Sequence, residues 1–162
     1  RQQRFALWLI SAGTFSALSI WFSASAVLAP LSEKWGISKT EGSFLTSMVN
    51  IGFVIGCILL TVTGWADQLK PQVLIVTGTT GGAVSNLALL LVSDLAGGLC
   101  ARLFVGIFMA LVYPPGVKLL STWFPPQQRG FATGFMFGAF CLGSAFPQLL
   151  NGLVAGHSWK LV

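Results

Sequence analysis

One arginine, Arg102, lies inside an apolar run of the sequence, and its side chain offers distinctive chemistry there. An arginine at the middle of a membrane costs about 2.5–3.5 kcal/mol to insert, so such residues usually face protein or water and mark functional positions. The planar guanidinium suits carboxylate, nitrate-like or phosphate groups, which it can bind through two hydrogen bonds. It could instead pair with backbone carbonyls or with residues outside this sequence, or snorkel to the membrane surface. We expect Arg102 to have a structural or substrate-binding role in a cavity.

A few uncharged polar or amphipathic side chains share the apolar runs and are expected to line the same cavity. These are Trp21, Ser23, Asn50 and Gln148. Ser23 belongs to a stripe with Ser16 and Ser19 at helical spacing, and such a stripe is more often a packing feature than a ligand site because hydroxyls bond back to their own helix. Hydrogen bonds between helices would satisfy the amides, including Asn151, equally well.

Catalytic and metal-binding chemistry is not expected. The long apolar runs contain no Asp or Glu, so they offer no general acid or base. Cys57, Cys100 and Cys141 are isolated, and His157 is the single histidine, so no zinc site or cofactor is predicted. The net charge of +5 comes from residues scattered between the runs, which does not favour a nucleic-acid-binding surface. The sequence therefore predicts a protein that is not an enzyme.

The elements that must position these residues are membrane-spanning helices. The chain is 54% hydrophobic and only 8% charged, far from the roughly 25% charge of soluble domains. Apolar runs long enough to cross a bilayer predict spans at about 5–30, 43–66, 72–93, 97–121 and 131–154. Two adjacent prolines, Pro125 and Pro126, interrupt the last two runs and predict a turn at the membrane surface. The predicted fold class is an all-α, polytopic helix bundle embedded in a lipid bilayer.

Orientation follows from the basic residues near the ends of the spans. With the amino terminus in the cytoplasm, five Lys or Arg residues lie inside and three outside, which favours that orientation in a plasma (inner) membrane. The chain does not begin with Met, and a new apolar run begins near residue 160, so we expect a fragment of a longer protein.

Two glycine pairs suggest an internal repeat. Gly52 and Gly56 flank a segment that resembles the one between Gly134 and Gly138, 82 positions later. Three spans would separate them, so the two helices would run in opposite directions, as in an inverted repeat. Chance is the alternative, because the chain has 19 glycines, and close helix packing accounts for small residues four apart. Gly138 and Gly143, with Pro147 beyond them, could additionally let the last span bend as it slides against a partner.

The chain resembles the amino-terminal half of a major facilitator superfamily transporter. Arg102, Gly106, Ala110 and Pro114 follow the family's fourth-helix pattern at equal spacing. The following loop and helix match at Trp123, Phe124, Pro125, Arg129, Gly130, Ala132 and Gly134. Residues 156–160 resemble the family's short outer loop, and residues 21–27 with 113–118 look like a branch labelled cyanate- or nitrate-porter-like. The resemblance implies that a sixth helix and a carboxyl-terminal half lie outside this sequence.

The resemblance implies a secondary active transporter of a small solute, an organic or inorganic anion, working by alternating access with a proton as one candidate coupling ion in a symporter. It also implies gating or conformational roles for Asp67, Gly106, Pro114, Gly134 and Arg129, to which the bending at Gly138 and Gly143 adds two more positions. In the loop at residues 63–72 only Asp67 aligns cleanly with the family pattern, so a solvated aspartate ending a helix is the alternative for that position. The alternative function is a membrane sensor or assembly module that transports nothing.

Overall fold

The computed structural model describes residues 2–153, and within them the chain is helical with no strand, as the fold-class prediction states. The helices are α1 (Gln2–Ala26), α2 (Leu28–Trp35), α3 (Lys39–Val62), α4 (Trp65–Gln68), α5 (Pro71–Ala88), α6 (Leu95–Met109), α7 (Tyr113–Trp123) and α8 (Pro126–Leu153). The predicted features at His157 and at residues 156–160 lie outside the described residues.

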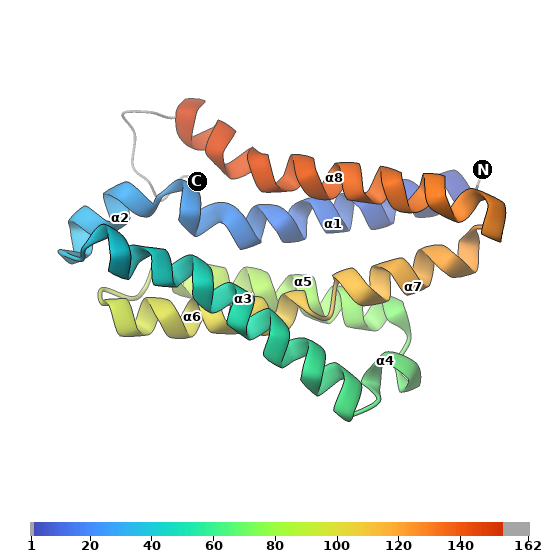
Figure 1. The fold of residues 1–162 in the computed structure, drawn as a ribbon, viewed down its shortest axis with the longest axis horizontal. Coiled ribbons are helices and arrows are strands. Elements are labelled where there is room, and N and C mark those ends of the chain that lie inside the picture. The colour runs from blue at the N-terminus through green and yellow to red at the C-terminus, as the bar shows by residue number, and fades with distance from the viewer. Residues whose placement is uncertain (1, 154–162) are drawn as a thin grey trace.

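The long helices lie side by side and alternate in direction along the chain (Figure 1). The most extensive contacts join α3 to α6 and α1 to α8, and α5 covers another side of α6. The helices α3 and α8 run in opposite directions, which is the arrangement expected from the glycine repeat (Figure 1). Two closely packed helix pairs, α3 with α6 and α1 with α8, therefore form most of the bundle. Contacts among α1, α5 and α6 join the two pairs.

Four helical segments are long and apolar enough to cross a membrane: Gln2–Ala26, Thr40–Val62, Leu95–Trp123 and Pro126–Leu153. Large apolar side chains are exposed on their outer faces; Phe5 is 71% exposed, Val62 79% and Leu142 68%. Such surfaces suit lipid rather than water. The remaining predicted span, 72–93, corresponds to α5, an 18-residue helix that is not in this group of four. Its place as a fifth span remains a prediction.

A proline ends α1 before the predicted limit at residue 30. Pro30 has no N–H, so it cannot donate to the carbonyl of Ala26, which is the last residue of α1. The chain turns at Val27 and continues as α2. The side-chain amide of Asn151 in α8 donates to the Ala26 carbonyl at 2.8 Å and replaces the missing backbone donor.

The same arrangement recurs in the opposite direction at Pro147, inside α8. Pro147 cannot donate to the carbonyl of Gly143, and the hydroxyl of Ser19 in α1 donates to that oxygen at 3.2 Å. Gly143 is buried against the backbone of Phe15, where a side chain would overlap the Phe15 carbonyl. Each of the two helices therefore supplies a polar side chain to a carbonyl that a proline has freed in the other.

Glycines also set the contact between α3 and α6. A Cβ on Gly106 would overlap the backbone of Val49 and Phe53, and one on Gly52 would overlap the Leu103 carbonyl. Gly56 meets the backbone of Ile107 in the same way. Because no side chain separates the two backbones, these helices approach as closely as small-residue interfaces in membranes allow.

The predicted fourth span is two helices rather than one continuous helix. It breaks at residues 110–112, between α6 and α7. Pro114 and Pro115 cannot donate to the carbonyls of Ala110 and Leu111, so the regular hydrogen-bond ladder stops there. The turn is closed by tighter bonds, including Val112 N–H to the Met109 carbonyl at 3.0 Å.

Candidate functional site

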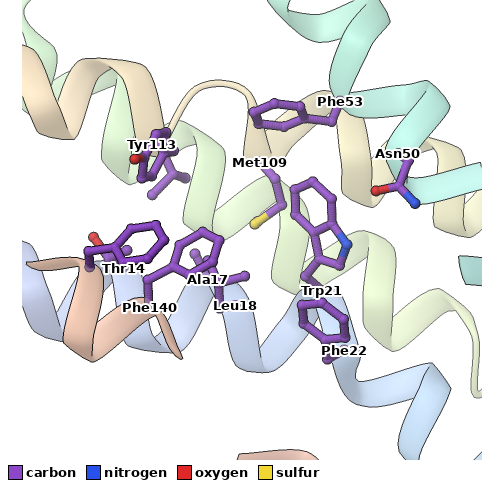
Figure 2. A pocket seen from close by; sticks show the side chains of 12 residues that line it. Thr14, Ala17, Leu18, Trp21, Phe22, Asn50, Phe53, Met109, Tyr113 and Phe140 are labelled. Atoms are coloured by element: carbon purple, nitrogen blue, oxygen red, sulfur yellow. The ribbon is translucent and has the colours of Figure 1, made fainter. Parts of the chain in front are cut away.

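A cavity of about 420 Å³ opens at the middle of the bundle (Figure 2). Its walls come from the central parts of α1, α3 and α8 and from the break between α6 and α7. The lining residues are Thr14, Ala17, Leu18, Trp21, Phe22, Asn50, Phe53, Met109, Val112, Tyr113, Phe137 and Phe140. This volume falls within the roughly 300–1,000 Å³ range of small-molecule pockets.

Aromatic rings form much of the cavity wall. The Trp21 and Phe53 rings are tilted with centroids 5.1 Å apart, and the Tyr113 and Phe140 rings meet edge to face at 5.7 Å. Phe137 stacks on Phe140 at 5.2 Å. These pairs connect α1 with α3 and α7 with α8, so the rings that face the cavity also hold its walls together.

Polar atoms lie at both ends of the cavity, with Trp21 and Asn50 at one end and Tyr113 and Thr14 at the other (Figure 2). The Asn50 amide nitrogen donates to the Thr46 carbonyl at 3.3 Å, and the Thr14 hydroxyl donates to the Ile10 carbonyl at 2.9 Å. None of the twelve lining residues is acidic or basic. Among the described residues, the cavity wall therefore offers a solute aromatic rings and neutral hydrogen-bonding groups.

Arg102 is fully buried behind this wall and is not a lining residue. Its Nη1 donates to the Ile20 carbonyl at 3.3 Å and to Asn86 Oδ1 at 3.0 Å, and its Nη2 donates to the carbonyl of Trp21. Its Nε has no partner among the described residues. The guanidinium thus bonds backbone carbonyls, one of the alternatives considered from the sequence, and it contacts the backbone of the residue whose indole lines the cavity.

Asn86 in α5 is a member of this network that the sequence analysis missed. Its Oδ1 accepts from both Arg102 and the Ser23 hydroxyl, the latter at 3.0 Å. Ser23 is buried and lies behind the wall with them. The sequence did offer one signal for Asn86, since it is an amide inside a run without charged residues. Polar groups at membrane depth need hydrogen-bond partners. The network joins α1, α5 and α6.

The other predicted site residues fall in several places. Trp21 and Asn50 line the cavity, whereas Gln148 is exposed on α8 and is not among the lining residues. Gly106 lies in the α3–α6 contact and Pro114 at the α6–α7 break. Gly143 lies in the α1–α8 contact. By contrast, a Cβ on Gly134 or Gly138 would meet no described atom within 4 Å.

Asp67 and Arg129 lie at the end of the bundle that holds the amino terminus. The Lys118 ammonium donates to Asp67 Oδ1 at 2.7 Å and to the Ala66 carbonyl at 2.7 Å, which joins α7 to α4. That hydrogen bond, and then the Lys118 charge, hold the pKa of the Asp67 carboxyl below its usual range. Arg129 donates to the carbonyls of Phe124 and Ser121 at 3.1 and 3.0 Å, fixing the turn between α7 and α8.

No metal site can be assembled in the described part of the chain, because no three His, Cys, Asp or Glu side chains gather there.

The sequence is similar to known transporters along nearly its whole length. It is 28% identical to the gentisate transporter of Corynebacterium glutamicum over 99% of this chain and 35% of the relative. It is 26% identical to the hexuronate transporter of Escherichia coli over 94% of this chain and 35% of the relative. It is 32% identical to "Probable anion transporter 3, chloroplastic" of Arabidopsis thaliana over 80% of this chain and 25% of the relative.

The chain thus spans about a third or less of the length of these relatives. The Major Facilitator Superfamily model matches residues 9–162, which is nearly the whole chain. Together with the apolar spans, this identifies an integral, multi-pass membrane protein. The chain belongs to the Major Facilitator Superfamily.

Proposed function

We propose that this chain forms part of a secondary active transporter that moves a small anion across the membrane by alternating access. The observation that carries the proposal is the cavity at the middle of the bundle, lined from four helical regions, in a chain of this family. Transporters bind solutes near the midplane, where discontinuous helices meet, and the α6–α7 break supplies Met109, Val112 and Tyr113 to the cavity.

The anionic character of the solute is supported by the relatives. Two of the relatives are named for gentisate and hexuronate, which are negatively charged, and the third is named as a probable anion transporter. The cavity offers neutral donors for anion oxygens, the indole N–H of Trp21 and the hydroxyl of Tyr113. We propose that Trp21 and Asn50 contact the solute, and that Arg102 acts behind them as a positioning residue through the Trp21 backbone.

Alternating access requires parts of the transporter to rock about the bound solute. The glycine contacts between α3 and α6 and the reciprocal bonds between α1 and α8 favour movement of these helices as paired units. We propose that a further part of the protein closes the cavity and that a coupling proton, where one is used, is carried there, because the apolar spans of this sequence contain no carboxylate.

We propose that the end of the bundle that carries Asp67, Lys118 and Arg129 lies on the cytoplasmic side of the plasma membrane, because the distribution of Lys and Arg residues favours that orientation. Asp67 is 87% exposed although it is paired with Lys118. Its second oxygen is therefore accessible to a partner from another part of the transporter. This supports a role for Asp67 in holding the cytoplasmic side closed.

The test is solute uptake by the complete gene product in liposomes, using a panel of mono- and dicarboxylates, nitrate, sugar acids and neutral sugars. We expect saturable uptake of at least one anion and a strong loss in Asn50→Leu. Ser47→Ala is the matched control, because Ser47 is exposed on α3 like Asn50 and bonds a carbonyl of its own helix, that of Ser43 at 3.3 Å, but does not line the cavity. Uptake of neutral sugars alone would refute the anion assignment, and a protein that moves no solute would refute the transporter assignment.

A further inference from the structure

The central cavity differs from three other hollows of the described bundle in its aromatic content. Six of its twelve lining side chains are aromatic. A hollow along α1, α5 and α7 has two aromatic residues among eight, and one between α1 and α8 has three among nine. The hollow beside α2 has none among its nine. The share of aromatic side chains is therefore highest at the centre among these four hollows, which favours a role for the rings beyond general apolarity.

The rings of the cavity are grouped in a way that leaves a space between them. Trp21 pairs with Phe53, and Tyr113 pairs with Phe140. The first group lies toward the end of the cavity that holds Asn50, and the second toward the end that holds Thr14 (Figure 2). Aromatic rings prefer offset or edge-to-face neighbours at centroid distances of about 4.5–7 Å. A flat ring placed between the two groups would have aromatic side chains on both sides and the thioether of Met109 beside it (Figure 2).

The polar groups fit the substituents of such a ring. The indole N–H of Trp21 donates only, the Tyr113 hydroxyl donates or accepts, and the Asn50 amide does both. A carboxylate or phenolic oxygen on the rim of the ring can reach neutral donors at either end. The lining offers no cation for the full charge of an acid, so the acid group would lie toward the open side of the cavity.

We propose that the solute of this transporter is an aromatic acid, whose ring lies between the Trp21 and Tyr113 groups and whose acid group faces the opening. This proposal rests on the proposed function and narrows it, because an aliphatic or inorganic anion would leave the aromatic faces of the cavity without a matching partner. A geometry-dependent ring contact adds to affinity beyond the burial of apolar area.

The experiment compares matched acids on the complete wild-type gene product, purified in detergent and assayed by calorimetric binding and by competition for uptake. Benzoate is paired with cyclohexanecarboxylate, and phenylacetate with cyclohexylacetate, since each pair has one charge and similar size. Glucuronate and a quaternary ammonium compound complete the panel. We expect the aromatic member of each pair to bind about two- to twelvefold more tightly.

Two variants locate the preference. Trp21→Leu keeps an apolar side chain but removes the ring, and we expect the aromatic preference to disappear. Trp8→Leu is the matched control on the same helix, because Trp8 is 65% exposed, contacts Phe135 and does not line this cavity. Phe140→Leu provides a second removal of a cavity ring if Trp21→Leu does not fold.

The outcomes separate this proposal from the function on which it rests. Equal binding of both members of each pair, or preferred binding of glucuronate, would refute the aromatic assignment and leave the anion transporter standing. A preference that survives both Trp21→Leu and Phe140→Leu would also refute it. Tight binding of the ammonium compound with none of the acids would refute both, since the rings would then serve a cation.

Discussion

Replacement of Arg102 tests whether its charge or its shape matters for stability. The side chain is completely buried and makes three hydrogen bonds, to two carbonyls of α1 and to Asn86 of α5. Bonds between membrane helices average about 0.6 kcal/mol, so these contribute about 2 kcal/mol together. Holding an arginine at mid-span costs about 2.5–3.5 kcal/mol. The two contributions nearly offset each other.

We therefore expect Arg102→Met to change the free energy of unfolding by no more than about 1.5 kcal/mol, because these contributions differ by only about 0.5–1.5 kcal/mol and methionine fills similar space without a charge. The acceptors remain satisfied, since Ile20 and Trp21 lie inside α1 and Asn86 Oδ1 keeps the Ser23 hydroxyl as donor. Arg102→Lys should be less stable, because one ammonium cannot reach acceptors on both α1 and α5 while its charge stays buried. Arg102→Ala should lose about 2–5 kcal/mol through the space left behind.

The assay is the fraction of monodisperse protein that survives heating in detergent, measured by size-exclusion chromatography for wild type and the three variants. Uptake in liposomes is measured in parallel. We expect Arg102→Met to keep its stability but to bind solute less tightly, since the Trp21 backbone loses its anchor. If the lysine variant is as stable as wild type and the methionine variant unfolds, the buried charge itself holds the helices together and the reasoning is refuted.

Three further predictions concern helix contacts and the cytoplasmic end. Ser19→Ala should lower stability by about 0.6 kcal/mol because the hydrogen bond to the α8 carbonyl is lost. Ser16→Ala is the control and should not lower it, because the Ser16 hydroxyl bonds only within α1. Equal effects of the two variants in thermal unfolding would contradict this. Gly106→Ala should lower the free energy of unfolding by about 1–3 kcal/mol, because the added Cβ overlaps the backbone of α3. Gly138→Ala should leave stability unchanged or slightly raised, because a Cβ there meets no described atom. The same heating assay compares the two variants. Asp67→Asn should be less stable than wild type at neutral pH. Because the pKa of Asp67 is lowered in the folded protein, the stability difference between the two proteins should close as the pH falls below about 4. A difference that widens in acid would contradict this pH dependence.

The helical fold was predictable from the sequence, because apolar runs of spanning length leave few other structures in a membrane. The breaks were harder to place. The prolines at 30 and 114 were visible, but the ends of α1 and α6 depend on where the freed carbonyls find new donors. Asn151 provides one from 125 positions away, a distance in sequence that no local pattern reveals.

The cavity was predictable only in part. Trp21 and Asn50 stand out because they are unusual in apolar runs, and both line the wall. Phe53 and Phe140 do not stand out among 13 phenylalanines. In a membrane both the lipid-facing and the buried sides of a helix are apolar, so the sequence period that separates inside from outside in soluble helices is weak. The rotation of each helix, and with it the cavity lining, follows from contacts such as Gly52 against Leu103.

The direction of the Arg102 contacts has a consequence for how the protein is made. Its acceptors, Ile20, Trp21 and Asn86, all precede it in the chain, so they are synthesised before it. An α6 that entered lipid alone would carry an unpaired charge into the bilayer. If the earlier helices α1 and α5 remain beside the insertion site until Arg102 arrives, the charge meets its acceptors at once, so the order of the helices along the chain favours their assembly.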